Sequence, residues 1–246
     1  YRNLKKKGVS VKRFLLKNYA TKFYKSYFLQ SSSHLPLIDA KLAISKDCKT
    51  INIKNKWITN SRSRRVGNFL RSKYDCVVST AKTINKDNPS LNCRIKGLEK
   101  KSPAVVIIDR SFKIKKNLNI FKIKSREIFI FTQKLNRGKQ KYFKKIGVNI
   151  IKLNKKKDPK EEFLEIYFFL KQLGFNRILI ESGLRYTNEL LRHHLISNFY
   201  LFKSFAASKS YYKNNTKTNL VRNLKVTSKN KINVNLNDDS LYKIEL

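Results

Sequence analysis

The chain has 246 residues, of which 41% are hydrophobic, and it carries 16 Phe and 12 Tyr. This apolar content is enough for a packed core and excludes a wholly disordered chain, while no uncharged apolar run approaches the roughly 18 residues of a membrane-spanning helix. The net charge is +40, from 56 Lys and Arg against 16 Asp and Glu.

Two explanations account for this charge. A polyanionic partner such as RNA, DNA or anionic lipid would attract a basic chain through counterion release. A coding bias that inflates Lys, Asn and Ile together would give the same composition. We favour the coding bias, because the basic residues are spread along the whole chain and no nucleic-acid-binding motif accompanies them.

Neither the cysteines nor the histidines are spaced like metal ligands. The 3 Cys form no CxxC pair, and the 3 His have no ligand spacing with any Cys, Asp or Glu. We therefore expect no disulfide framework and no metal site. Unpaired cysteines are typical of a reducing compartment, which predicts a cytoplasmic protein.

Residues 1–34 precede the regular part of the chain. Over residues 9–29 apolar side chains recur at helical intervals, as at Val11, Leu15 and Tyr19, opposite Lys and Arg. The pattern predicts one amphipathic helix that packs on the domain as a connector, with a membrane-surface helix as the alternative. Since the chain opens at Tyr1 and has no Met, we expect it to be a piece of a longer product.

From residue 35 onward, short apolar runs alternate with amphipathic stretches, which is typical of an α/β fold with a largely parallel sheet. The polar tail shows alternation near residues 224–226 and 241–244, which predicts two antiparallel edge strands. Strands are predicted at 35–44, 75–80, 104–109, 127–131, 148–153 and 177–181, and helices at 60–73, 140–145, 161–173 and 184–195.

The first of these helices has a recognisable start. Asn60 or Ser61 is expected to cap it, because a short polar side chain can accept a hydrogen bond from the backbone of the first turn. Its apolar residues Val66, Phe69 and Leu70 are expected to be buried.

The strand–glycine–helix joint at residues 180–184 is a candidate anion site. Backbone N–H groups at a helix N-terminus point outward, and the helix dipole favours a phosphate there. A single Gly is weak support, because many such turns need one for conformational reasons. The chain has neither GxGxxG nor GxxxxGK[ST], which disfavours a Rossmann domain and a P-loop.

An ordered set of motifs resembles a known family over about residues 35–205. The motifs lie at residues 41–47, 56–59, 64–65, 70–71, 83–94, 108–111 and 179–183. Together they resemble the C-terminal reductase domain of the bifunctional riboflavin-biosynthesis deaminase/reductase. The resemblance implies a dihydrofolate-reductase-like, three-layer α/β fold with a mixed, mostly parallel sheet and antiparallel edge strands at the C-terminus.

The resemblance also implies a domain organisation and an activity. Residues 1–34 would connect to an upstream deaminase-like domain, and residues 35–246 would form the reductase domain. The zinc-deaminase signature, H-x-E with P-C-x-x-C, is not in these residues. The activity implied is NADPH-dependent reduction of 5-amino-6-(5-phosphoribosylamino)uracil at C1′ of the sugar, by a cytoplasmic homodimer.

Site residues follow from the resemblance, position by position. Lys41 and Glu181 are expected to be catalytic. Substrate contacts are expected from Asn55, Arg71, Leu91, Arg94 and Glu181. Cofactor contacts are expected from Ala43, Trp57, Thr83, Asp87, Arg110, Gly183, Leu184, Arg185, Tyr186, Thr187, Asn188 and Glu189.

These residue types suit the chemistry. Arg binds a phosphate dianion through its planar fork, and Trp57 offers a flat apolar wall to a ring. Lys41 and Glu181 can exchange protons with the ring-opened sugar while hydride arrives, as general acid–base catalysts. We expect the side chains of Lys41, Trp57, Arg71, Asp87, Arg94 and Glu181 to converge on one cleft.

Departures from the family pattern leave two alternatives open. Cys48 stands where the family has the Gly of Asp-Gly, which predicts a side chain on a left-handed backbone. Val66 replaces an acid, and Ser197 and Asn198 replace an acidic pair. The alternatives are a decayed, inactive reductase and a basic nucleic-acid-associated module on the same fold.

Overall fold

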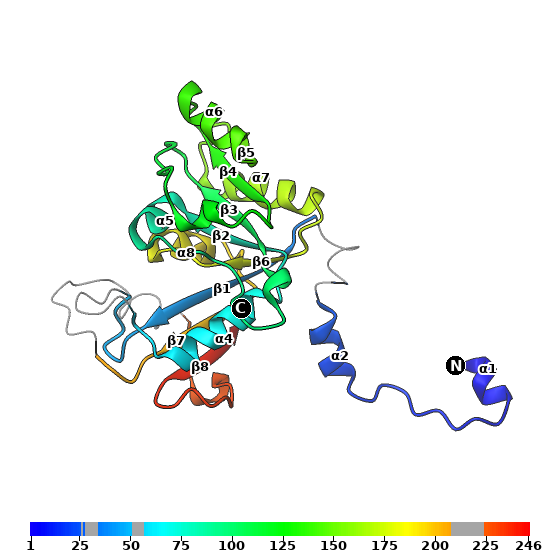
Figure 1. Ribbon diagram of the computed structural model, residues 1–246. Helices are drawn as coiled ribbons and strands as arrows, with labels where there is room; N and C mark the ends of the chain where they lie inside the picture. Colours follow the sequence, from blue (N-terminus) through cyan, green and yellow to red (C-terminus); the bar gives the residue numbers. More distant parts are fainter. Residues whose placement is uncertain (26, 28–33, 51–56, 208–223) are drawn as a thin grey trace.

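A single eight-stranded sheet forms the centre of the protein (Figure 1). The computed structural model describes residues 1–25, 27, 34–50, 57–207 and 224–246. The strand order is β5-β4-β3-β2-β6-β1-β7-β8, with every neighbouring pair parallel except β7 and β8. The strands are β1 (Leu37–Ile44), β2 (Cys76–Thr80), β3 (Ala104–Ile108), β4 (Ile128–Thr132), β5 (Val148–Lys152), β6 (Arg177–Ile180), β7 (Asn198–Lys203) and β8 (Ser240–Glu245).

Helices cover both faces of this sheet, which gives three layers. One face carries α4 (Ser61–Arg71), α5 (Ala81–Asp87) and α6 (Arg137–Lys145), and the other carries α7 (Pro159–Gln172) and α8 (Leu184–Arg192). Short 3₁₀ turns lie at η1 (Glu99–Lys101), η2 (Asn119–Lys122) and η4 (Ser228–Asn230).

The strands β3 and β4 are apolar, except for Thr132 at the end of β4, because both of their faces are buried. All five residues of β3 and all five of β4 are buried. Successive side chains alternate between the two layers, so Val106 packs with α7 and α8 while Val105 and Ile107 pack with α5 and α6. Burial of each such side chain contributes about 1.5–3 kcal/mol.

The predicted fold class is confirmed, and so are the predicted strands and helices from residue 35 to residue 195, within one to three residues at their ends. The helix α5 was not predicted, because its seven residues (AKTINKD) are mostly polar and bury only Ala81 and Ile84.

The start of α4 is as predicted, but its buried face is not. Asn60 Oδ1 accepts a hydrogen bond from the backbone N–H of Ser63 at 2.9 Å. The residues that α4 buries are Ser63 and Gly67, whereas Phe69 is 44% exposed and Val66 and Leu70 are half-buried. Small side chains on the inner face let this helix lie close to the sheet.

The single helix predicted over residues 9–29 is wrong. The structure has two short helices, α1 (Arg2–Lys6) and α2 (Lys17–Phe23), joined by a non-helical stretch. Phe14 and Leu16 have left-handed backbone angles, with φ of 62° and 55°, which prevents one continuous helix. Both helices lie apart from the sheet in Figure 1, and Lys22 forms an ion pair with Glu245 of β8 at 2.9 Å. Positions 26 and 28–33 lie outside the described residues.

The C-terminal tail contributes one described edge strand rather than the two predicted. β8 pairs antiparallel with β7, whereas residues 224 and 225 form a turn. Leu224 is 3% exposed in the core, and Lys225 has a left-handed φ of 45° that breaks an extended strand. The alternating hydrophobicity at residues 224–226 therefore reflects the buried side chain of Leu224 in a turn and not a strand.

No helix in the described part of the chain combines the length and the hydropathy that a bilayer crossing requires.

Candidate active site

Lys41 and Glu181 face each other beneath α4. Lys41 lies in the middle of β1, and Glu181 directly follows β6, the parallel neighbour of β1. Alternate residues of neighbouring strands share one face of a sheet, so both side chains reach the same space. Lys41 Nζ lies 4.0 Å from Glu181 Oε2, and the two side chains are 22% and 10% exposed.

Arg71, at the end of α4, holds the Glu181 carboxylate with two parallel hydrogen bonds. Its Nε donates to Oε1 at 2.6 Å and its Nη2 donates to Oε2 at 3.0 Å. Nη1 donates to Asn68 Oδ1 at 2.9 Å and to the Asn92 carbonyl at 3.2 Å. Four of the five guanidinium N–H groups are thereby engaged, so in this structure Arg71 orients Glu181.

These contacts set the charge of the carboxylate. Burial alone raises the pKa of Glu181, but Arg71, Lys41 and Arg94 outweigh burial and hold that pKa below its ordinary value. Burial also lowers the pKa of Arg71, and the ion pair with Glu181 more than restores it. Glu181 is therefore ionised at neutral pH and is not a proton donor there.

Lys41 has the opposite character. Burial lowers the pKa of Lys41 below its ordinary value, the nearby charge of Arg71 lowers it further, and Glu181 partly opposes both. The stem of the side chain lies over Gly67, where an added Cβ would come within 3.9 Å of Lys41 Cε. Nζ lies 5.4 Å from the centroid of the Phe202 ring. A lysine in this setting gives up its proton more readily than an exposed one.

The turn between β6 and α8 lies against α5. The backbone N–H of Gly183 donates to Thr83 Oγ1 at 3.1 Å, and an added Cβ at Gly183 would contact the same oxygen at 3.4 Å. Thr83 Oγ1 also lies 3.1 Å from Thr80 Oγ1. The predicted cofactor residues Thr83 and Gly183 are thus brought together, directly after Glu181.

The predicted cofactor residues at the start of α8 differ in their exposure. Gly183 is exposed and no side chain caps the helix. Among the predicted residues here, Arg185 is exposed, Leu184, Asn188 and Glu189 are half-buried, and Tyr186 and Thr187 are buried. The Tyr186 hydroxyl lies 3.1 Å from that of Tyr167, so this ring belongs to the core. Glu189 pairs with Arg192 at 3.2 Å.

Arg110 lies after β3 and pairs with a buried carboxylate. Its Nε donates to Glu162 Oε1 at 2.7 Å, while the Arg110 side chain remains 45% exposed. Gln133 holds the second Glu162 oxygen at 2.6 Å. Arg110 influences the pKa of Tyr186, so its guanidinium lies near the first turn of α8.

The other predicted residues are more dispersed. Ala43 is half-buried two residues beyond Lys41 on the same face of β1, and Arg94 is exposed but near enough to lower the pKa of Glu181. Leu91 is 4% exposed and packs in the core. Asp87 is exposed at the end of α5, one turn beyond Thr83. Asn55 lies outside the described residues.

Trp57 lines a cavity whose lining does not include Lys41 or Glu181. Its ring is 49% exposed and stacks with the guanidinium of Arg64, 4.8 Å from the ring centroid. It lines a cavity of about 430 Å³ together with residues 58–60, 204–206 and 238–239. The structure thus joins Lys41, Arg71 and Glu181 directly, with Arg94 nearby, whereas no contact given for the described residues joins Trp57 or Asp87 to this group.

Two features of the site follow from single residues. Cys48 has a left-handed φ of 60°, as its place in the Asp-Gly position predicts. Arg126, which no sequence motif indicates, donates to the carbonyls of Ser90 and Leu91 beside the site. An isolated Arg in an irregular basic segment carries no sequence signal of its own.

Comparisons with known proteins identify the family and agree with the fold. Residues 36–203 match the family model described as RibD C-terminal domain. The chain is 29% identical over 214 residues to riboflavin biosynthesis protein RibD of Buchnera aphidicola subsp. Baizongia pistaciae, covering 81% of this chain and 56% of that protein. The chain thus spans about half the length of such relatives.

A shorter relative and two solved structures extend the comparison. The 5-amino-6-(5-phosphoribosylamino)uracil reductase of Buchnera aphidicola subsp. Acyrthosiphon pisum is 31% identical over 162 residues, covering 61% of this chain and 75% of that protein. Acinetobacter baumannii RibD shares the fold with a TM-score of 0.72 at 19% identity, covering 99% of this chain and 67% of that chain. Saccharomyces cerevisiae riboflavin biosynthesis reductase Rib7 has a TM-score of 0.66 at 15% identity, covering 92% and 99%.

The match to the family model spans most of the chain and includes β1, which carries Lys41, and β6, which directly precedes Glu181. The chain therefore belongs to the RibD C-terminal domain family.

Proposed function

We propose that this chain catalyses the NADPH-dependent reduction of 5-amino-6-(5-phosphoribosylamino)uracil to its ribitylamino product. The observation that carries the proposal is the Lys41–Glu181 pair, 4.0 Å apart and largely buried beside the Gly183 turn. A relative named as this reductase, 31% identical and covered over 75% of its length, supports the same reaction. The comparisons favour it over a nucleic-acid-binding module.

Lys41 is the proton donor in this proposal. Reduction at C1′ begins when the C1′–O4′ bond breaks, its electron pair goes to the ring oxygen, and the lone pair of the attached nitrogen forms a C1′=N bond. The Lys41 ammonium protonates the departing ring oxygen. NADPH, when bound, supplies the hydride that C1′ accepts. One proton and one hydride are added in total, and the nitrogen ends as a neutral amine.

Glu181 acts as an ion in this scheme. Its carboxylate is held ionised by Arg71 and Lys41, so it stabilises the positive charge that develops on the C1′=N nitrogen. The Glu181 carboxylate also partly compensates the positive charge of the Lys41 ammonium before Lys41 gives up its proton. A positioned general acid, the role proposed for Lys41, accelerates a step by about 10²–10⁴-fold.

The residues around Gly183 fit a dinucleotide phosphate. The Gly183 N–H is engaged with Thr83, but no side chain caps α8, so the N–H groups that follow Gly183 in the first turn are left for an anion. We propose cofactor contacts from Gly183, Leu184 and Arg185 through this turn, with Thr83 fixing it. The remaining proposed cofactor contacts are Ala43, Trp57, Asp87, Arg110, Tyr186, Thr187, Asn188 and Glu189, with Tyr186 offering only its backbone.

For the phosphosugar, we propose contacts from Asn55, Arg71, Leu91 and Arg94, as well as from Glu181. A phosphate dianion suits the cationic surroundings, where Arg71, Arg94 and Lys41 outnumber the one carboxylate. Because Arg71 is already engaged with Glu181, Arg94 is the freer of the two guanidinium groups for the phosphate.

The organisation of the protein is part of the proposal. We propose that residues 1–34 are a connector, that residues 35–246 are the reductase domain, and that the domain works as a cytoplasmic homodimer. The three cysteines are buried and unpaired, which suits a reducing compartment. Sedimentation of the purified chain, alone and with NADPH, tests the dimer.

The decisive test of function is turnover by defined variants. The chain should oxidise NADPH only when the phosphoribosylaminouracil is added, and Lys41→Met should lower kcat by about 10²-fold or more because the proton donor is lost. Glu181→Gln should lower kcat comparably, because Arg71 and Lys41 then lack their counter-charge. NADPH absorbance and chromatography of the ribitylamino product are the measurements.

Lys144→Met is the matched control, because Lys144 is exposed on α6 on a different part of the sheet. It should keep wild-type kcat and KM. A folded wild-type chain that consumes no NADPH with this substrate would refute the proposed reaction. An active Lys41→Met variant would remove Lys41 from the chemistry and leave the fold assignment untouched.

A further inference from the structure

The loop that follows α5 is held by two arginines from different parts of the chain. Arg126 Nη1 donates to the Leu91 carbonyl at 2.8 Å, and its Nη2 donates to the Ser90 carbonyl. Arg71 Nη1 donates to the next carbonyl, that of Asn92, at 3.2 Å. Three successive carbonyls, at residues 90, 91 and 92, thus accept hydrogen bonds from guanidinium groups.

This loop needs such support because its backbone is strained. Leu91 has a left-handed φ of 50°, which a branched side chain rarely adopts, and it keeps this angle while its side chain is buried in the core. Ser102 Oγ accepts from the N–H of Cys93 at 3.1 Å. The next residue, Arg94, lies near Glu181, so the loop conformation determines where Arg94 points.

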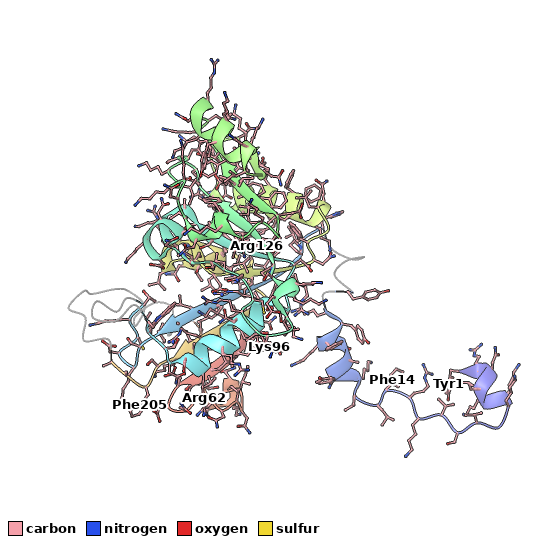
Figure 2. All side chains as sticks on the ribbon, in the orientation of Figure 1. Tyr1, Phe14, Arg62, Lys96, Arg126 and Phe205 are labelled. Carbon is pink, nitrogen blue, oxygen red and sulfur yellow. The ribbon has the colours of Figure 1, made fainter. Side chains whose placement is uncertain are left out.

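Arg126 is half-buried and forms no ion pair within the described part of the chain. Its Nε is buried and has no hydrogen-bond partner there, and neither has the side-chain oxygen of Asn92 in the same loop. Burial and the charge of Arg71 lower the pKa of Arg126 to about 10. Of the two arginines, Arg71 alone pairs with a carboxylate, that of Glu181, so the pair of arginines retains net positive charge. In Figure 2, Arg126 lies among the strands and helices of the main body, unlike Tyr1 and Phe14.

A phosphorylated sugar offers what this cluster lacks. Its phosphate supplies negative charge, and its hydroxyls both donate and accept hydrogen bonds. A loop that is clamped by two like charges and strained at Leu91 is best stabilised when an anion binds beside it. Retention of a half-buried arginine with a buried, unpartnered Nε and only carbonyl partners is otherwise unfavourable.

We propose that Arg126 is a positioning residue for the sugar phosphate: it fixes the loop of residues 90–94 so that Arg94 is presented to the ligand. This inference rests on the proposed function for the identity of the substrate. Arg126 acts through the loop carbonyls and contributes its charge to the same subsite. Affinity for the phosphosugar depends on it, whereas the chemical step and the NADPH site do not.

The test is the split between KM and kcat in Arg126→Gln. This variant should raise KM for the phosphoribosylaminouracil by about tenfold or more, as expected for lost hydrogen bonds from a charged donor. Its kcat should stay within about threefold of wild type, and its KM for NADPH should not change. Arg126→Lys keeps the charge and one carbonyl contact, so it should restore part of the affinity.

Arg137→Gln is the matched control, because Arg137 is exposed on α6; it should behave as wild type. An Arg126→Gln variant with unchanged KM for the phosphosugar would overturn the proposal, and so would an equal rise in both KM values. If Arg126→Gln fails to fold, Arg126→Lys carries the test, with an expected KM rise of several fold.

Binding of ribose 5-phosphate, measured by calorimetry, separates this inference from the proposed reaction. A wild-type chain without turnover that binds ribose 5-phosphate, and binds it about tenfold more weakly as Arg126→Gln, would refute the reaction and keep the role of Arg126. Equal binding by wild type and Arg126→Gln would refute the role of Arg126.

Discussion

Lys41 and Glu181 show how one buried pair assigns two separate roles to two ionisable groups. The pKa of each is displaced downward, Lys41 by burial and Glu181 by its cationic neighbours against the effect of burial. The displacement moves Lys41 toward ready proton release and keeps Glu181 charged. Two groups that could each exchange protons, judged by residue type, are thereby distinguished by environment.

The pH dependence of turnover follows from this difference. Lys41 must be protonated to act as the donor, so kcat should fall as pH rises through its pKa, which lies below the ordinary lysine value of 10.5. Removal of the Glu181 charge lowers the Lys41 pKa further, so Glu181→Gln should move the alkaline limb of its residual activity to lower pH. A pH–rate series for both proteins measures this.

Lys144→Met provides the reference for that series, since substitution of an exposed lysine should leave the pH of the alkaline limb unchanged. An alkaline limb at or above the ordinary lysine value of 10.5, in a chain that stays folded over the range, would contradict the assignment of Lys41 as donor.

Among the secondary-structure elements, α5 and α8 are coupled by one hydrogen bond. Gly183 N–H donates to Thr83 Oγ1 at 3.1 Å, across a separation of 100 residues in sequence. The bond fixes the turn whose exposed N–H groups we assign to the cofactor phosphate. The helix α5 buries only two residues, so its position depends on this hydrogen bond to the Gly183 turn as well as on packing.

Thr83→Val tests this coupling. Valine has nearly the same shape but cannot accept the Gly183 N–H, so we expect a loss of about 1–2 kcal/mol in unfolding free energy. We also expect the Kd for NADPH to rise by about three- to tenfold. Urea unfolding and calorimetry are the measurements.

Thr21→Val, at an exposed position of α2, controls for the general effect of the substitution. Unchanged NADPH affinity in a Thr83→Val protein of lowered stability would show that the turn does not need the hydroxyl, and would detach Thr83 from the cofactor site.

How far sequence predicts these elements depends on where each side chain is buried. Apolar runs such as β3 and β4 are predicted well, because strands buried on both faces have no alternative pattern. The prediction of one continuous helix over residues 9–29 is wrong, because the periodicity does not reveal the left-handed backbone angles at Phe14 and Leu16. The prediction of a strand near residues 224–226 is wrong, because a single buried side chain in a turn, that of Leu224, gives the same alternating pattern as a strand.

The same limit applies to the site. Lys41, Arg71 and Glu181 were predicted by family motif, and the structure brings them within hydrogen-bonding or ion-pair distance. The pairing of Arg71 with Glu181, in place of a phosphate, was not predicted, because residue type gives no information on which anion an arginine meets. Arg126 was missed because its role comes from the backbone carbonyls that surround it.

For the whole molecule, the charge of +40 governs encounters with anionic ligands. Both proposed ligands carry phosphate, so long-range attraction should raise their association rates, and salt should screen it over about 10 Å at 0.1 M. We expect kcat/KM to fall several-fold between about 0.02 M and 0.2 M salt, with kcat nearly constant.

Steady-state kinetics in sodium chloride measure this effect, with sucrose at matched viscosity as the control for diffusion. A value of kcat/KM that is independent of salt would mean that the basic surface plays no part in ligand capture, and that its composition reflects coding bias alone.

The solitary indole of Trp57 has a practical consequence. It is the one Trp in 246 residues, it is 49% exposed, and it rests on the guanidinium of Arg64 at 4.8 Å. The chain also has 12 Tyr, but emission excited at wavelengths beyond the absorption of tyrosine originates from this one indole, and indole emission overlaps the absorption band of a reduced nicotinamide. Ligand binding near Trp57 can therefore be measured by intrinsic fluorescence, without any attached dye.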